Sequence, residues 1–274
     1  MTDLAIVIVS YNARAELEAC LASLADHPPT TPHEIVVVDN ASSDGSPAVT
    51  RTRWANVTVI ETGHNLGFAR ATNRGIRATA SRLLLLLNSD TLPPPGAVDR
   101  LVGILLSRTD VAVVGPRLVD ANGTLEISFG SMISPFAELR QKCLIHGYAR
   151  RLPLLTQLVE RRAREERVVD WVSAACLLVR RPEAEAAGLL DERFFLYGED
   201  VDFCAAVRAL GRHVLYAPVV EVVHHRGRSG QSAPARTATA YRRSHLAFYR
   251  KHHPAWHPVL RAYLRVRGKL PPGE

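Results

Sequence analysis

Short apolar, β-branched runs alternate with helix-forming segments through residues 4–115, and few folds accommodate that order. The patterns predict strands at residues 4–10, 34–39, 57–61, 83–88 and 111–115, and helices at residues 14–25, 68–80 and 94–107. Strands that alternate with helices in this way predict an α/β fold with an open, mostly parallel sheet.

The alternation stops between residues 117 and 170. Residues 136–167 are basic and amphipathic, and we expect them to form a helical insertion. Beyond it we expect a strand at residues 168–179, a helix at residues 199–210, and one or two strands at residues 214–223, interrupted at Pro218. Two further helical segments are predicted in the tail.

The excess positive charge lies at one end of the chain. Of the 34 Lys and Arg residues, nine fall in residues 236–274, where Glu274 is the only acid, so the rest of the chain is close to neutral. One face of the last predicted helix is apolar, with Arg261 and Arg265 opposite; that face comprises Val259, Leu260, Tyr263 and Leu264. This pattern favours an anionic membrane surface as partner, or packing on the rest of the protein. Nucleic acid is not expected, since no nucleic-acid-binding motif is present.

Other features bear on the compartment. The longest uninterrupted apolar run, residues 83–87, is far below the roughly 18 residues of a spanning helix. We expect no signal peptide, because residues 1–10 have neither a basic leader nor a cleavage site. The four cysteines are far apart and form no CxxC pair, which predicts buried free thiols in a reducing, cytoplasmic compartment.

Polar residues follow the first four predicted strands. They are Ser10-Tyr11-Asn12, Asp39-Asn40, Glu61 to Asn65 and Asn88-Ser89-Asp90. Each alone is typical of a turn or helix cap, but ligands of open α/β sheets bind outside the carboxyl ends of the strands. The sequence has no GxGxxG after a strand, no P-loop, no HExxH and no GxSxG, which argues against dehydrogenases, P-loop ATPases and the simplest hydrolases.

Several longer strings carry a resemblance to a known family. They are IVIVSYN (6–12), VVVDNASSDGS (36–46), HNLGFARATNRGI (64–76), LLLLNSDTLPPP (84–95), DWVSAACLLVRR (170–181), LDERFFLYGEDVDFCAAVRALG (190–211) and VVHHRGRS (222–229). In this order, over about residues 4–230, the chain resembles family 2 glycosyltransferases, above all bacterial rhamnosyltransferase-type members. The resemblance implies a GT-A fold, which is Rossmann-like, with a nucleotide half at about residues 1–116 and an acceptor half at about residues 117–230. Residues 231–274 would then be a basic helical tail that anchors the protein at a membrane surface, and the insertion would face the acceptor.

The resemblance also implies a metal site for Mn2+ or Mg2+. Asn88-Ser89-Asp90 occupies the family's DXD position, so Asp90 is the expected ligand, while Asn88 binds nucleotide or a metal-bound water. His224 matches the family's histidine, and a divalent cation there would neutralise the departing diphosphate. His225 is the alternative, although neighbours on a strand point to opposite faces.

Two further matches imply the class of sugar donor and the catalytic base. Asp39 stands where relatives accept a hydrogen bond from a pyrimidine ring, which favours a dTDP- or UDP-sugar. Asp200, with Glu199, matches the catalytic Glu-Asp pair, whose second acid deprotonates the acceptor and implies inversion; acids in a first helical turn are also favoured by the helix dipole alone. The remaining expected nucleotide-sugar contacts are Ser10, Tyr11, Asn12, Asn65, Arg70, Ser89 and Trp171.

The implied reaction is transfer of rhamnose from dTDP-rhamnose, or of a hexose from a UDP-sugar, to a lipid-linked or polysaccharide acceptor at the inner face of the cell membrane. Ala174 and Leu190 depart from the family pattern and leave the sugar open. The alternatives are a sugar-1-phosphate nucleotidyltransferase, which would need a glycine-rich loop after the first strand, and an inactive nucleotide-sugar-binding protein, for which Asn88 in place of Asp is the argument.

Overall fold

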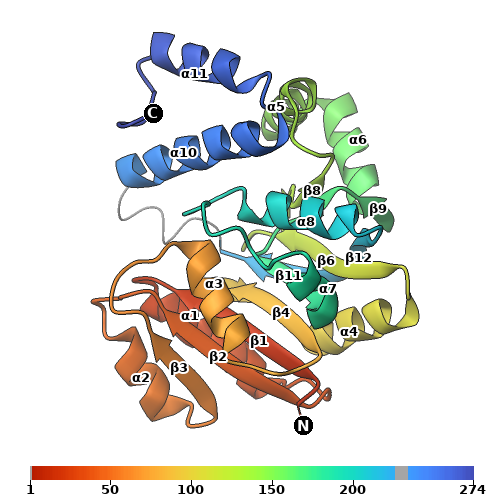
Figure 1. Ribbon diagram of the computed structural model, residues 1–274. Coiled ribbons are helices and arrows are strands. Elements are labelled where there is room, and N and C mark those ends of the chain that lie inside the picture. Colours follow the sequence, from red (N-terminus) through yellow and green to blue (C-terminus); the bar gives the residue numbers. More distant parts are fainter. Residues whose placement is uncertain (1, 226–233) are drawn as a thin grey trace.

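The structure is a computed structural model that describes residues 2–225 and 234–274 (Figure 1). Within these residues a ten-stranded sheet has the order β3-β2-β1-β4-β11-β6-β12-β5, with β7 beside β6 and β9 beside β12, and β8 and β10 form a small second sheet. The strands are β1 (Leu4–Ser10), β2 (His33–Asp39), β3 (Val57–Glu61), β4 (Leu83–Asn88), β5 (Thr91–Leu92), β6 (Val111–Val119), β7 (Leu125–Glu126), β8 (Phe129–Gly130), β9 (Arg167–Val169), β10 (Trp171–Val172), β11 (Cys176–Arg180) and β12 (His213–His224).

Helices cover both faces of the sheet. They are α1 (Arg14–Asp26), α2 (Ser46–Arg53), α3 (Phe68–Arg77), α4 (Ala97–Ser107), α5 (Pro135–Ala149), α6 (Pro153–Ala163), α7 (Arg181–Ala186), α8 (Glu199–Ala209), α10 (Pro234–His252) and α11 (His257–Val266). In β1, Ile6 and Ile8 belong to the core that α1 and α4 also line, while Val7 on the other face packs against α3. Burial on both faces is why this strand is apolar throughout.

The sheet confirms the predicted α/β class. Strands β3, β2, β1 and β4 are parallel, and β6 is parallel to β12. Strand β11 lies antiparallel between β4 and β6, which places a late segment of the chain in the middle of the sheet. The carboxyl ends of β1, β2 and β4 therefore meet at one edge.

The strand expected at residues 168–179 is wrong as a single element, because the chain there forms β9, β10 and β11. The backbone N–H of Asp170 donates to Gly130 and that of Ser173 donates to Ser128, which draws β10 out to pair with β8. Residues 214–223 lie in one strand, β12, and its register shifts between Ala217 and Glu221 where an interruption at Pro218 was expected. Helices α2 and α7 and the short strands β5, β7 and β8 have no counterpart in the prediction.

The basic insertion forms α5 and α6, and α5 packs against the tail helix α10. His245 and Tyr249 of α10 both donate hydrogen bonds to Glu138 of α5, at 2.7 and 2.9 Å. Phe248 of α10 is 1% exposed within the core on the α8 face of the sheet. The first tail helix is thus packed on the rest of the molecule.

The apolar face predicted for the last helix divides in two. In α11, Leu264 is buried and Leu260 packs on the core, while Val259 and Tyr263 remain exposed. Part of this face therefore packs on the core, as the packing alternative predicted, and its binding to a membrane stays a prediction.

All four cysteines are free, as predicted; three are buried, whereas Cys143 is exposed, contrary to the expectation of burial. Among the described helices, none combines the length and the apolar character needed to cross a bilayer.

Candidate active site

Two polar side chains at the ends of β1 and β2 are buried, and each has an oxygen without a hydrogen-bond partner in the described part of the chain. Ser10 and Asp39 are register neighbours on these strands and are 0% and 2% exposed. Asp39 Oδ2 accepts a hydrogen bond from the backbone N–H of Ser42 at 3.0 Å. Asp39 Oδ1 and Ser10 Oγ have no hydrogen-bond partner in the described part of the chain. Buried polar atoms are nearly always paired, so this edge is prepared for a ligand that supplies a donor and an acceptor.

Asn12 and Asn65 hold the loops around this edge. Ser43 donates its backbone N–H to Asn12 Oδ1 at 2.7 Å, and Asn12 donates its own N–H to the Ser42 hydroxyl at 2.9 Å. Asn65 Oδ1 accepts from the Asn40 side chain at 3.0 Å and from its own loop backbone. Tyr11 is half-buried beside them. The oxygens of both asparagines are thus used in shaping the loops.

Asn88 and Asp90 meet His224 where β5 pairs with β12. His224 Nε2 lies 3.2 Å from Asp90 Oδ1 and 3.4 Å from Asn88 Nδ2. Ser89, which lies between Asn88 and Asp90 in the sequence, is also buried. His225 contributes its backbone N–H to the Asp90 carbonyl at 2.8 Å, so His224 is the histidine whose ring faces Asp90. The expected motif residues 226–229 lie outside the described residues.

Glu126 is a residue of this cluster that the sequence did not reveal. Its Oε2 accepts a hydrogen bond from His224 Nδ1 at 2.7 Å, and both side chains are less than 10% exposed. It lies in the two-residue strand β7, inside the segment without periodicity, where no pattern distinguishes it. A ring nitrogen fixed by a carboxylate leaves the other nitrogen aimed at a ligand, as in many histidine metal sites.

The charges around His224 favour a cation. Burial opposes a charged imidazole, but the hydrogen bonds and charges of Asp90 and Glu126 outweigh it and raise the pKa of His224 to about 9. Among the described residues no group of three His, Cys, Asp or Glu side chains forms a complete metal site. Asp90 and His224 supply two ligands of suitable chemistry, and diphosphate oxygens commonly complete such sites.

The Glu199-Asp200 pair reaches the same edge through the loop after β10. Asp200 Oδ2 accepts the backbone N–H of Ala174 at 3.3 Å, and the carbonyl of Ala175 accepts the backbone N–H of Asn88 at 3.0 Å. Two adjacent residues of one loop thus contact the start of α8 and the end of β4.

Both acids of the pair are reluctant to ionise. Burial raises the pKa of Glu199 well above its usual value, and the charge of Asp200 raises it further. Burial also raises the pKa of Asp200, although backbone N–H groups of Ala174 and Val201 partly offset the effect. Glu199 Oε2 has no partner among the described residues. Carboxylates with raised proton affinity are suited to accept a proton near neutral pH.

The polar groups of Trp171 and Arg70, both expected to contact the nucleotide-sugar, bind other protein groups. The Trp171 ring is buried and donates its indole N–H to the Ser131 carbonyl at 3.0 Å. Arg70 is 55% exposed and lies 3.6 Å from Glu192 in an ion pair on the surface of α3. In this structure both polar groups are engaged by protein.

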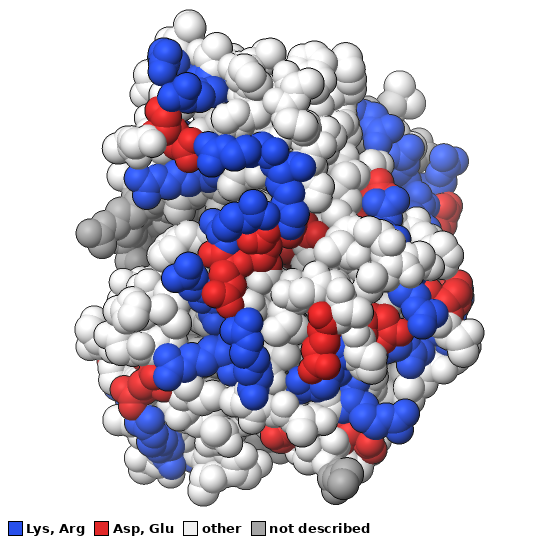
Figure 2. All heavy atoms as spheres, viewed as in Figure 1, with Lys and Arg blue, Asp and Glu red and all other residues white. Residues whose placement is uncertain are grey.

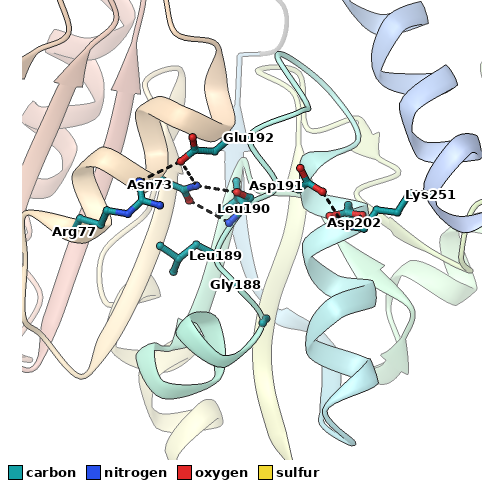
Figure 3. Close-up of a pocket in the computed structure, with 10 residues that line it drawn as sticks. Asn73, Arg77, Gly188, Leu189, Leu190, Asp191, Glu192, Asp202 and Lys251 are labelled. Atoms are coloured by element: carbon teal, nitrogen blue, oxygen red, sulfur yellow. Dashed lines mark hydrogen bonds and ion pairs between the residues drawn. The ribbon is translucent and has the colours of Figure 1, made fainter.

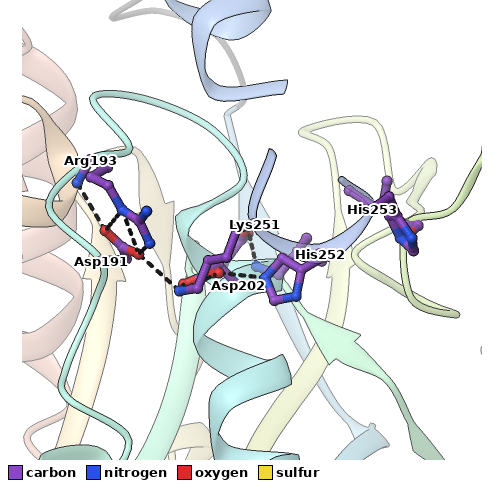
Figure 4. A network of polar contacts seen from close by, with 9 residues as sticks. Asp191, Arg193, Asp202, Lys251, His252 and His253 are labelled. Carbon is purple, nitrogen blue, oxygen red and sulfur yellow. Dashed lines mark hydrogen bonds and ion pairs between the residues drawn. The ribbon is translucent and has the colours of Figure 1, made fainter. Parts of the chain in front are cut away.

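A pocket of about 290 Å³ lies between α3, the segment before α8, and α10 (Figure 3), and its lining includes none of the site residues predicted from sequence. Its polar groups are paired with one another: Lys251 Nζ lies 2.8 Å from both Asp191 and Asp202, and His252 Nε2 lies 2.6 Å from Asp202 (Figure 4). Arg193 also binds Asp191, at 2.5 Å. This network of ion pairs and hydrogen bonds joins α10 to α8 and to the segment before α8. Its charged groups are paired with one another, so it gives no indication of a ligand site.

This fold, with its polar edge beside β4, is that of the GT-A glycosyltransferases. A mannosyltransferase from Pyrobaculum calidifontis, solved with GDP-Man and Mn2+, superposes with a TM-score of 0.62 at 20% identity, over 95% of this chain and 68% of that one. GalNAc-T7, solved with UDP, GalNAc and Mn2+, gives 0.64 at 17% identity over 96% of this chain and 51% of that one.

The glycosyl transferase family 2 model matches residues 5–153, and the chain belongs to this family. It is 32% identical to the N-acetylglucosaminyl-diphospho-decaprenol L-rhamnosyltransferase of Mycobacterium tuberculosis, over 98% of this chain and 91% of that protein. It is 26% identical to the low-salt glycan biosynthesis hexosyltransferase Agl10 of Haloferax volcanii, over 82% and 67%. The protein is therefore a glycosyltransferase, and the nucleotidyltransferase and inactive-protein alternatives are set aside.

Proposed function

We propose that this enzyme transfers rhamnose from dTDP-rhamnose to a hydroxyl of a lipid-linked, diphosphate-bearing N-acetylglucosamine acceptor, with inversion. The observation that carries the proposal is the end-to-end match to a rhamnosyltransferase whose name specifies such an acceptor. The reaction takes place at the inner face of the cell membrane, where a lipid-linked acceptor lies.

The base of the donor binds at Ser10 and Asp39. Thymine and uracil present a ring N–H, and the buried, unpaired Asp39 Oδ1 accepts it. Cytosine lacks that N–H, so the same carboxylate disfavours it. Ser10 Oγ is free to bond the ligand beside it. The loops held by Asn12 and Asn65 enclose the base.

Asp90 and His224 would hold a divalent cation, Mn2+ or Mg2+, with Asn88 beside them. When bound, the cation would supply positive charge that offsets the negative charge developing on the diphosphate. Asn88 in place of a carboxylate lowers the anionic charge of the site, so we expect modest metal affinity without bound nucleotide.

Asp200 removes the proton of the acceptor hydroxyl. Its raised pKa matches this role, and Ala174 orients it through a backbone hydrogen bond. A base that delivers the acceptor oxygen opposite the leaving diphosphate gives inversion at the anomeric carbon. Burial raises the pKa of Glu199 well above its usual value, which disfavours a second negative charge beside Asp200.

The test is a donor panel with a short-chain N-acetylglucosaminyl diphosphate lipid and Mn2+. We expect dTDP-rhamnose to give a product of inverted anomeric configuration by NMR, and Asp200→Asn to lower turnover about 100- to 10,000-fold while dTDP binding survives. Asp110→Asn, an exposed loop acid, is the matched control.

Transfer from a UDP-hexose alone would replace the donor assignment with the hexosyltransferase alternative. Retained configuration, or full activity of Asp200→Asn, would remove the role of Asp200.

A further inference from the structure

Large apolar side chains are exposed along the edge of the molecule where α5 and α11 meet. Phe136 and Leu139 of α5 are 76% and 64% exposed, and Val266 of α11 is 87% exposed. We call this edge the α5–α11 surface, and it comprises Phe136, Leu139, Trp256, Val259, Tyr263 and Val266. Contiguous exposed apolar groups of this size usually mark a binding surface.

The two helices meet near their N-terminal ends. The rings of Phe136 and Trp256 contact edge to face, with centroids 6.2 Å apart. From Trp256 the exposed residues recur at spacings of three, four and three, which places them along one side of α11. Figure 1 places α5 and α11 together at the top, and in Figure 2 this upper edge is largely uncharged, with lysine and arginine on its flank.

The segments that build this surface are strongly basic. Residues 135–164 and 234–274 contain 16 of the 34 Lys and Arg residues, but only three acids, Glu138, Glu160 and Glu274. All three acids are engaged within the protein, Glu138 by His245, Glu160 by Tyr148 and Glu274 by Arg250. Lys142, Arg250 and Lys251 are in turn paired with acids, and the other Lys and Arg residues leave these two segments with an excess of positive charge.

We propose that the α5–α11 surface docks on an anionic lipid bilayer. It inserts its aromatic and aliphatic side chains into the interface, and the flanking arginines and lysines bind lipid phosphates. The proposal rests on the proposed function, because a lipid-linked acceptor requires the enzyme to work at such a surface. A second copy of the chain would bring like charges together, which disfavours self-association through this face. The anchor is thus shared between the insertion and the tail, two segments about 100 residues apart in sequence.

Tryptophan fluorescence gives a direct test. Trp54 and Trp171 are 9% and 8% exposed, whereas Trp256 is 42% exposed, so a change caused by lipid reports on Trp256. With vesicles of phosphatidylglycerol and phosphatidylcholine we expect a blue shift and quenching by brominated lipid. Pure phosphatidylcholine should bind at least tenfold more weakly, and added salt should weaken binding to the anionic vesicles.

Substitutions on the surface separate it from the rest of the tail. Leu139→Ser combined with Val266→Ser should lower vesicle affinity at least tenfold at unchanged melting temperature. Leu106→Ser, on the 55% exposed Leu106 of α4, is the matched control and should bind as the wild type does. Equal binding by the double variant, or no shift of Trp256 emission, overturns the proposal. A dimer that dissociates in the double variant would instead assign the surface to a second copy.

The same variants keep this proposal apart from the proposed function. Transfer to a soluble short-chain acceptor should be unchanged in the double variant, while transfer to acceptor embedded in vesicles should fall with vesicle affinity. Transfer without vesicle binding overturns the docking surface alone. Vesicle binding without transfer from any donor overturns the proposed function alone.

Discussion

Glu126 offers the sharpest test of the proposed metal site, because it contacts the proposed ligand His224 and nothing in the sequence marks it. Glu126→Gln keeps an oxygen that accepts the His224 Nδ1–H but loses the charge; Glu126→Leu loses both. Removing a carboxylate that orients a ligating histidine typically lowers metal affinity 10- to 100-fold, or about 1.4–2.8 kcal/mol. The 2.7 Å contact between side chains less than 10% exposed puts Leu near the upper value and Gln near the lower one.

The assay is a titration with Mn2+ in the presence of dTDP, followed by the electron paramagnetic resonance signal of free Mn2+. Glu221→Gln, an exposed acid on the same strand as His224, is the control. Wild type, Gln and Leu should bind Mn2+ in descending order, while dTDP binding without metal stays constant. Equal Mn2+ affinity in wild type and Glu126→Gln, together with equal affinity in a folded Glu126→Leu protein, would refute the positioning role of Glu126.

Two further predictions concern single acids. Asp39→Asn should weaken dTDP binding about 10- to 100-fold, because a hydrogen bond to a charged acceptor contributes about 1.5–3 kcal/mol; calorimetry that finds unchanged affinity would exclude Asp39 from base recognition. Burial opposes ionisation of Glu138, but hydrogen bonds from His245, Tyr249 and Lys142 outweigh it and hold its pKa at about 2. Its stabilising contribution is therefore complete above the ordinary pKa of 4.5 and is lost as pH falls towards 2. In urea unfolding, Glu138→Gln should be less stable than wild type at pH 7, and the gap should close below pH 4; a constant gap would contradict this.

The strands of residues 4–88 could be predicted from sequence because each carries its own local pattern. The runs ending at Ser10, Asp39 and Asn88 are apolar on both faces, and a polar residue ends each of them at the same edge. The likeness of residues 4–230 to family 2 glycosyltransferases then gave the class of enzyme, which the family match confirms.

Contacts that depend on the pairing of distant strands could not be predicted from the sequence. The position of β11 between β4 and β6 is set by neighbours that lie far away in the chain. Glu126 becomes part of the cluster only because β7 pairs with β6, which in turn lies beside β12 and so beside His224. The division of residues 168–179 into three strands likewise follows from the pairing of β10 with β8.

The tail shows why charge and packing must be separated in any experiment on this enzyme. Its net positive charge invites a truncation after residue 230, yet α10 contributes Phe248 and Tyr249, which are 1% and 4% exposed, to the core. Lys251 and His252 also bind Asp202, two residues after the proposed base Asp200. Removing α10 would uncover that core and release α8, so lost activity would say nothing about membranes. Substitution of exposed residues on α5 and α11 changes the surface while leaving the core and the Asp202 contacts in place.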